Sequence, residues 1–119
     1  MPANVEFKEK LLERTLQFSE DLINLTNKLP KTSSNLMILN QIIRSGTSVG
    51  ANYREACEAE SAKDFIHKIR IAKKEAKESI YWFELLIRTN PNYKNNLEKL
   101  LSEIVEFIKI FAKISSKFK

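Results

Sequence analysis

The sequence predicts an all-α protein, an antiparallel up-down-up-down four-helix bundle, and three observations support this. The 119 residues include only two glycines and three prolines, while 43% are apolar and 29% are charged, a balance typical of long-helix proteins. Four long segments repeat apolar side chains every three or four positions. Short polar segments separate them, so consecutive helices must run in opposite directions. We therefore expect a single domain over residues 1–119.

The first two helices are expected at about residues 4–29 and 34–60. The first has an apolar stripe and is ended by Pro30, and the stripe consists of Leu11, Phe18, Leu22, Leu25 and Leu29. A serine at position 34 can cap the second helix. The stripe of that helix contains both glycines of the chain and consists of Leu36, Leu39, Ile43, Gly46, Gly50, Tyr53 and Cys57.

The last two helices are expected at about residues 61–89 and 91–118. Ser61 and Asp64 have the spacing of a capping box, and Asn90-Pro91 has the order of a cap followed by a first helical residue. The third helix has heptad spacing, which suits near-antiparallel bundle packing, in Phe65, Ile69, Ala72, Ala76, Ser79, Phe83 and Leu86. The fourth has a stripe of Leu97, Leu101, Ile104, Ile108, Phe111 and Phe118.

Two features of the second helix indicate close contact with a neighbouring surface. Each glycine costs a helix about 1 kcal/mol relative to alanine, and close approach of another backbone would compensate. We therefore assign Gly46, Gly50, Ser48 and Asn52 to close helix packing or an oligomer interface. A polar seam runs beside the glycines through Gln41, Ser45, Ser48, Asn52 and Glu55. This seam is either a solvated face or a partly buried subunit interface, and the absence of lysine between Thr32 and Ala62 favours the interface.

The positive charge lies in the second half of the chain. Residues 1–60 carry seven basic and eight acidic groups, whereas residues 61–119 carry thirteen and seven. One row on the third helix, with Lys73 beside it, contains Lys63, His67, Arg70, Lys74 and Lys77. Nucleic-acid phosphates would be a natural counterpart of this row. The alternative is an ordinary solvated face, and the nearby Glu75 and Glu78 dilute its field.

No motif points to catalysis, a cofactor or a metal. His67 is the only histidine, and its pairing with Asp64 falls short of the carboxylate–histidine sets of di-iron bundles. Cys57 is the only cysteine, which excludes an internal disulfide and suits a reducing cytoplasm. No run of about 18 uncharged apolar residues is present, so we expect no membrane span. We expect a protein that is not an enzyme and takes no small-molecule substrate.

A long motif spans residues 41–56 and reads QIIRSGTSVGANYREA. It is followed by Ala59-Glu60-Ser61, Asp64-Phe65, Lys73-Lys74-Glu75-Ala76 and Glu78-Ser79. With these residues the chain resembles the bacterial four helix bundle protein family, some of whose genes lie in intervening sequences of large-subunit ribosomal RNA genes. The match is dense from about residue 30 to residue 86. The resemblance implies an antiparallel bundle that assembles into a ring-like homopentamer.

The resemblance also implies roles for particular residues and partners. The polar motif of the family falls here on Arg44, Ser48, Asn52, Glu55, Glu75 and Glu78. An arginine in this helix would need a carboxylate partner if buried, so we predict a buried or interfacial network of Arg44, Glu55, Glu75 and Glu78. A related accessory protein of diversity-generating retroelements is a basic pentamer that works with a reverse transcriptase and nucleic acid.

The expected function is a non-enzymatic, homo-oligomeric scaffold or adaptor that contacts RNA, DNA or an acidic protein through the basic helix face. The alternative is a dedicated nucleic-acid-binding protein without sequence preference. A third and weaker hypothesis, an enzyme, would require a composite site between subunits around Arg44, Glu75 and Glu78.

Overall fold

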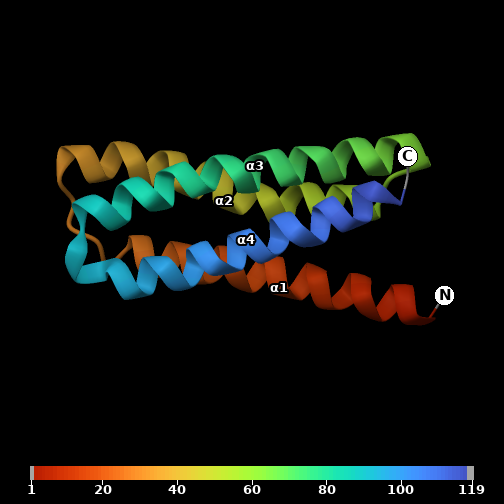
Figure 1. Ribbon diagram of the computed structural model, residues 1–119, viewed down its shortest axis with the longest axis horizontal. Coiled ribbons are helices and arrows are strands. Elements are labelled where there is room, and N and C mark those ends of the chain that lie inside the picture. The colour runs from red at the N-terminus through yellow and green to blue at the C-terminus, as the bar shows by residue number, and fades with distance from the viewer. Residues whose placement is uncertain (1, 118–119) are drawn as a thin grey trace.

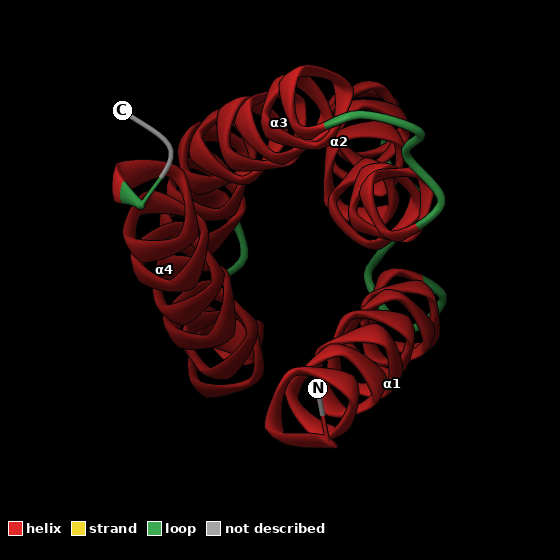
Figure 2. Cartoon of the chain, turned by 90° about the vertical axis from the view of Figure 1, so that its right-hand side faces the viewer, coloured by secondary structure: helices red, strands yellow, loops and turns green. Residues whose placement is uncertain are grey.

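The computed structural model describes residues 2–117 and confirms the all-α four-helix bundle (Figure 1). Its helices are α1 (Pro2–Thr26), α2 (Ser33–Cys57), α3 (Ala62–Thr89) and α4 (Lys94–Ser116), with a short 3-10 helix, η1 (Pro91–Tyr93), before α4. Consecutive helices run in opposite directions along a body of 46 × 22 × 19 Å. Seen along the bundle, α1 and α3 occupy opposite corners, and α2 and α4 lie between them (Figure 2).

The helix ends differ from the predicted ones by up to three residues. α1 ends at Thr26 rather than 29, and α2 ends at Cys57 rather than 60. Thr32 caps α2, because its hydroxyl accepts a hydrogen bond from the Asn35 N–H at 3.1 Å. Ser61 caps α3 in the same way through Asp64 N–H, at 3.0 Å. Pro91 begins the 3-10 turn instead of the fourth α-helix, and the predicted end at residue 118 lies outside the described residues.

The core lies between the four helices, and α1 and α3 bury most of the stripes that the spacing predicts. On α4 the predicted Leu101 and Ile108 are only half-buried, Phe107 is fully buried instead, and Phe118 lies outside the described residues. On α2 the predicted stripe is rotated away from the core centre. Leu36 is exposed, and Ile43, Gly50 and Cys57 are only half-buried. The buried side of α2 consists instead of Asn35, Ile38, Leu39, Ile42, Ser45, Gly46, Val49, Tyr53 and Ala56. The glycines therefore lie on the edge of α2 that faces α1, and a polar serine takes a central position.

Both glycines allow α1 to approach α2 closely within the same chain. A Cβ atom at Gly46 would lie 2.5 Å from Leu22 Cδ2. A Cβ atom at Gly50 would lie 3.1 Å from Thr15 Cβ and 3.4 Å from its carbonyl oxygen. The packing partner is thus α1, so the close approach that the glycines predict is met inside the subunit and does not itself require a second one.

A pair of asparagines joins the first turn of α2 to the end of α3, at one end of the bundle. Asn35 Nδ2 donates to Asn90 Oδ1 at 2.8 Å, and Asn90 Nδ2 donates back to Asn35 Oδ1 at 3.1 Å. Both side chains are buried and also donate to backbone carbonyls, Asn35 to Pro30 and Asn90 to Leu86. Asn90 therefore does not act as the side-chain cap that the sequence predicts, because its amide is engaged by α2 and α3.

We predict that Gly46→Ala lowers the free energy of unfolding by about 1 kcal/mol. Overpacking costs about 1–3 kcal/mol, and the better helix propensity of alanine recovers about 1 kcal/mol of that. Leu22 is fully buried, so it has no solvent into which to move. Urea denaturation measures the change. Ser48→Ala is the control, because the Ser48 hydroxyl bonds to its own helix, at Arg44 O, and we expect a change within about 0.5 kcal/mol. A Gly46→Ala variant more stable than the wild type would contradict this packing.

Candidate functional site

The polar seam of α2 meets α3 along one edge of the bundle. At its centre Ser45 Oγ and Ser79 Oγ lie 2.8 Å apart, and both side chains are fully buried. Ser79 also donates to the carbonyl of Glu75 at 2.9 Å, so the pair is satisfied without water. This buried bond sets the register of α2 against α3.

Arg44 lies next to this bond and binds two carboxylates of α3. Its guanidinium donates to Glu75 Oε2 at 3.1 Å and makes a second, shorter ion pair with Glu78. Glu78 also accepts from Trp82 Nε1 at 2.9 Å, and Tyr81 packs edge-on against the Trp82 ring. The hydrogen bond from Trp82, followed by that from Arg44, lowers the pKa of Glu78 below its ordinary value.

The sequence predicts a network that is either buried or interfacial. Within one chain the network is not buried, because the Arg44 side chain is 48% exposed, and its burial at a subunit interface stays a prediction. Position 44 lies on the outer edge of the bundle, so water reaches the guanidinium. Glu55 does not belong to the network and pairs with Lys68 of α3 at 2.8 Å, three turns away along α2. Sequence spacing put Glu55 on the correct side of α2 but did not reveal its partner.

Ser48 and Asn52 lie on the same edge, and both are half-buried. Their side chains bond to their own helix: Ser48 Oγ donates to Arg44 O at 2.6 Å, and Asn52 Nδ2 donates to Ser48 O at 2.8 Å. Ser48 and Asn52 therefore give this edge of α2 short polar side chains that make no hydrogen bond to α3. Gly46 and Gly50, predicted together with them, face α1 instead.

The basic row follows the outer side of α3. Its members Lys63, His67, Arg70, Lys74 and Lys77 are exposed, and Lys73 is half-buried beside them. Across the described residues, no member of the row makes an ion pair with a carboxylate. The N-terminal end of the row has a hollow lined by Ala62, Lys63, Ile66, His67 and Arg70. The row is accessible to an anionic partner.

Residues 2–117 offer no cluster of metal ligands and no activated thiol. No group of three or more histidine, cysteine, aspartate or glutamate side chains gathers there in a way that could hold a metal ion. Cys57 is a free, half-buried thiol, and burial raises its pKa, which opposes formation of a thiolate nucleophile. None of the described helices combines the length and apolar character needed to cross a membrane.

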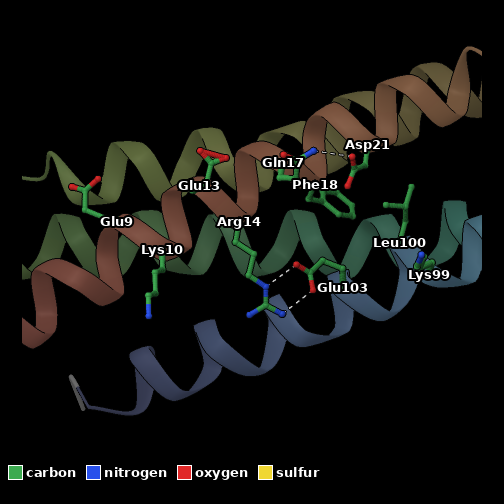
Figure 3. Close-up of a pocket in the computed structure, with 10 residues that line it drawn as sticks. All are labelled: Glu9, Lys10, Glu13, Arg14, Gln17, Phe18, Asp21, Lys99, Leu100 and Glu103. Carbon is green, nitrogen blue, oxygen red and sulfur yellow. Dashed lines mark hydrogen bonds and ion pairs between the residues drawn. The ribbon is translucent and has the colours of Figure 1, made fainter.

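A groove between α1 and α4 is a feature that sequence reasoning missed. The N-terminal part of α1 diverges from α4 (Figures 1 and 2), and a groove of about 720 Å³ with Phe18 and Leu100 in its lining follows the gap. Arg14 crosses it and binds Glu103 through two hydrogen bonds of 2.7 Å (Figure 3). The guanidinium also lies 5.4 Å from the centre of the Phe107 ring. No pattern in the sequence pairs residues 89 positions apart, so only the fold reveals this bridge.

Comparison with known proteins identifies a family for most of the chain. Residues 8–113 match the model of the 23S rRNA-intervening sequence protein family. A search of the curated proteins finds no match. Among solved structures, the chain is similar to a protein of unknown function from the S23 ribosomal protein family of Bacteroides thetaiotaomicron, with 40% identity and a TM-score of 0.80. The similarity covers 87% of this chain and 96% of that one.

We predict that Arg44→Ala lowers the free energy of unfolding at neutral pH by no more than about 1 kcal/mol, the range of exposed ion pairs. Because its partners lower the pKa of Glu78, the stabilisation is present above the ordinary glutamate pKa and is lost as the pH falls through the lowered one. Urea denaturation at neutral pH and near pH 3 measures this loss.

The control for this prediction is Arg54→Ala, which removes an exposed arginine of α2 that makes no ion pair with any described residue. We expect Arg54→Ala to change stability by the same small amount at both pH values. A loss of several kcal/mol for Arg44→Ala would show that a second surface buries the network in solution.

Proposed function

Because the chain belongs to the 23S rRNA-intervening sequence protein family, and the similar solved protein of Bacteroides thetaiotaomicron has unknown function, we propose a function from the surface of the bundle itself. The proposed function is that of a homo-oligomeric scaffold or adaptor without catalysis of its own. The observation that supports this proposal is the set of large apolar side chains left in solvent. They are Val5, Phe7, Leu16, Ile23, Leu36, Met37 and Tyr81.

Several of these side chains form a stripe on α1. Leu16 is 54% exposed and Ile23 is 42% exposed. They follow directly after Thr15 and Leu22, the residues that pack on the glycines, so they lie on the outer flank of the α1–α2 hairpin. Leu36 and Met37 are two further exposed apolar side chains, at the start of α2. Apolar surface of this kind, bordered by charges, marks protein interfaces, and a copy of the same chain is the simplest partner.

The family resemblance and the single cysteine add two finer points to the proposal. The resemblance favours a pentamer as the assembled form. One free, half-buried cysteine suits a cytoplasmic location, where thiols stay reduced.

Nucleic-acid binding is a second candidate function, and the unpaired basic row supports it. Its exposed cations extend over four turns of α3. Lysine and arginine side chains that have no carboxylate within the described part of the chain can bind phosphates without first breaking an ion pair. Binding of this kind would be independent of sequence, because nothing in the row is arranged to read base edges.

We predict that the wild-type protein has a mass in solution that is a multiple of 13.8 kDa and that Leu16→Glu combined with Ile23→Glu shifts it to the monomer. Two buried carboxylates would oppose apolar contact between copies. Light scattering coupled to size-exclusion chromatography measures the mass. The control is Gln17→Glu with Asn24→Glu, which adds the same charge to α1 but leaves the apolar stripe intact. A wild-type mass of 13.8 kDa at every concentration would remove the scaffold proposal.

For the second candidate we predict that the affinity for a labelled single-stranded RNA falls by orders of magnitude between about 50 and 200 mM salt. Replacing Lys74 and Lys77 with alanine should weaken binding equally for unrelated RNA sequences. It should also reduce the slope of log affinity against log salt by about 1 for each phosphate that the variant no longer neutralises. Fluorescence anisotropy measures both the affinity and its slope. Absence of binding at about 50 mM salt would exclude this function.

A further inference from the structure

We propose that the basic row of α3 binds an acidic row on α1 of a second copy of this chain, so that copies join head to tail. The acidic row consists of Glu6, Glu13 and Glu20. The inference rests on the proposed homo-oligomerisation and specifies its surfaces. It also names the anion that the basic row accepts: a helix of the same protein rather than a nucleic acid.

Both rows are exposed, and within the acidic row Glu6 pairs with Lys10 at 3.1 Å and Glu20 accepts a hydrogen bond from Gln17 at 3.4 Å. Glu13 and Glu20 on α1 and Arg70 and Lys77 on α3 are solvent-accessible, and none of them takes part in an ion pair with another described residue. Glu13 points away from α4, whereas Arg14 beside it reaches across to α4 (Figure 3). Glu13 lines the α1–α4 groove but takes no part in the bridge between Arg14 and Glu103.

The two rows lie at equal heights along the bundle. Adjacent residues of α2 fix this register, because Gly46 packs on Leu22 of α1 and Ser45 bonds to Ser79 of α3. Leu22 and Ser79 are therefore level. Both α1 and α3 have their N-terminal ends at the same end of the bundle (Figure 1). Equal numbers of residues counted back along each helix then reach equal heights, since every residue rises about 1.5 Å.

Counting back from this level pairs opposite charges at each step. Two residues back are Glu20 on α1 and Lys77 on α3. Nine residues back are Glu13 and Arg70, and sixteen residues back are Glu6 and Lys63. Copies related by rotation about an axis parallel to the bundle keep these heights, so each carboxylate of one copy meets a cation of the next. Such alignment gives specificity of pairing and fixes its register.

Apolar side chains continue both rows at the same end. Ile23 follows Leu22 on α1, and Tyr81 stands two residues after Ser79 on α3, where it is 61% exposed. An interface of charges alone would gain little in water, because exposed ion pairs contribute about 0–1 kcal/mol each. Contact between Ile23 and Tyr81 supplies the apolar anchor that stable interfaces need, and tyrosine is enriched at such anchors.

The positions of α1 and α3 at opposite corners determine the kind of assembly (Figure 2). Because the acidic row of α1 and the basic row of α3 lie on opposite corners, they cannot contact each other within one molecule. In a two-fold dimer, the acidic row of one copy would face the acidic row of the other, or the basic row would face the basic row. The contact is thus heterologous, with α1 of each copy on α3 of the next. Heterologous contacts close into rings when the rotation between copies divides a full turn.

Charge reversal tests the pairing of the two rows. One variant carries Glu13→Lys and Glu20→Lys, a second carries Arg70→Glu and Lys77→Glu, and a third carries all four changes. Because like charges then face each other, we expect the first two to weaken association at least about hundredfold. We expect the third to regain the wild-type mass, since its rows are complementary again. Analytical ultracentrifugation measures association, and circular dichroism verifies that each variant is helical.

The control is Lys109→Glu with Lys113→Glu on α4, which changes the net charge as much as the second variant does and should keep the wild-type mass. If the wild type associates and the row variants keep its mass, the head-to-tail contact is wrong and the scaffold proposal stands. If the four-fold variant stays dissociated, the rows do not pair with each other. A wild-type monomer overturns both proposals. RNA that binds the intact assembly and is released by Arg70→Glu and Lys77→Glu would show that the row serves nucleic acid instead.

Discussion

The position of α2 between its two neighbours is the constraint on which the rest of the bundle depends. On one side its glycines remove the side chains that would hold α1 away. On the adjacent side Ser45 bonds to Ser79, a buried polar contact that is satisfied only at one register. A shift of α2 by one turn would separate the Ser45 hydroxyl from Ser79 and would place a side chain of α2 where one of the two glycines now faces α1. The heights of all charged groups on α1 and α3 follow from these contacts.

Hydrophobic spacing was sufficient to predict the four helices, because each has apolar side chains at helical intervals, and α1 and α3 bury most of the stripe predicted for them. It failed on α2, where the stripe through Leu36, Ile43 and Cys57 lies away from the core centre. The reason is physical: Ser45 looks polar in a pattern but is buried, since Ser79 and the carbonyl of Glu75 satisfy the pair. Heptad spacing did place Ser79 on the buried stripe of α3, but it left Ser45 in a polar seam, because spacing along one helix does not show which partner satisfies a hydroxyl.

The candidate site was predicted unevenly for a related reason. Arg44 does meet Glu75 and Glu78, since facing helices bring their polar edges together. The exposure of Arg44 and the pairing of Glu55 with Lys68 were not predicted. Both depend on how far each residue lies from the bundle axis, and spacing along one helix does not give that distance. Neither the Trp82 hydrogen bond nor the bridge between α1 and α4 has a local pattern that would predict it. The direction in which a charged row faces is readable from sequence, whereas the identity of its partner requires the fold.

The reciprocal amide bonds between Asn35 and Asn90 restrict how this sequence can change over time. Each amide fills the donor and acceptor of the other in a buried place. Loss of one partner strands the other without water, while replacing both with apolar groups of similar shape is nearly neutral. During evolution, Asn35 and Asn90 can therefore be replaced only through a less stable intermediate with one asparagine, or by two substitutions that arise together. The start of α2 and the end of α3, 55 positions apart, are therefore expected to change together rather than separately.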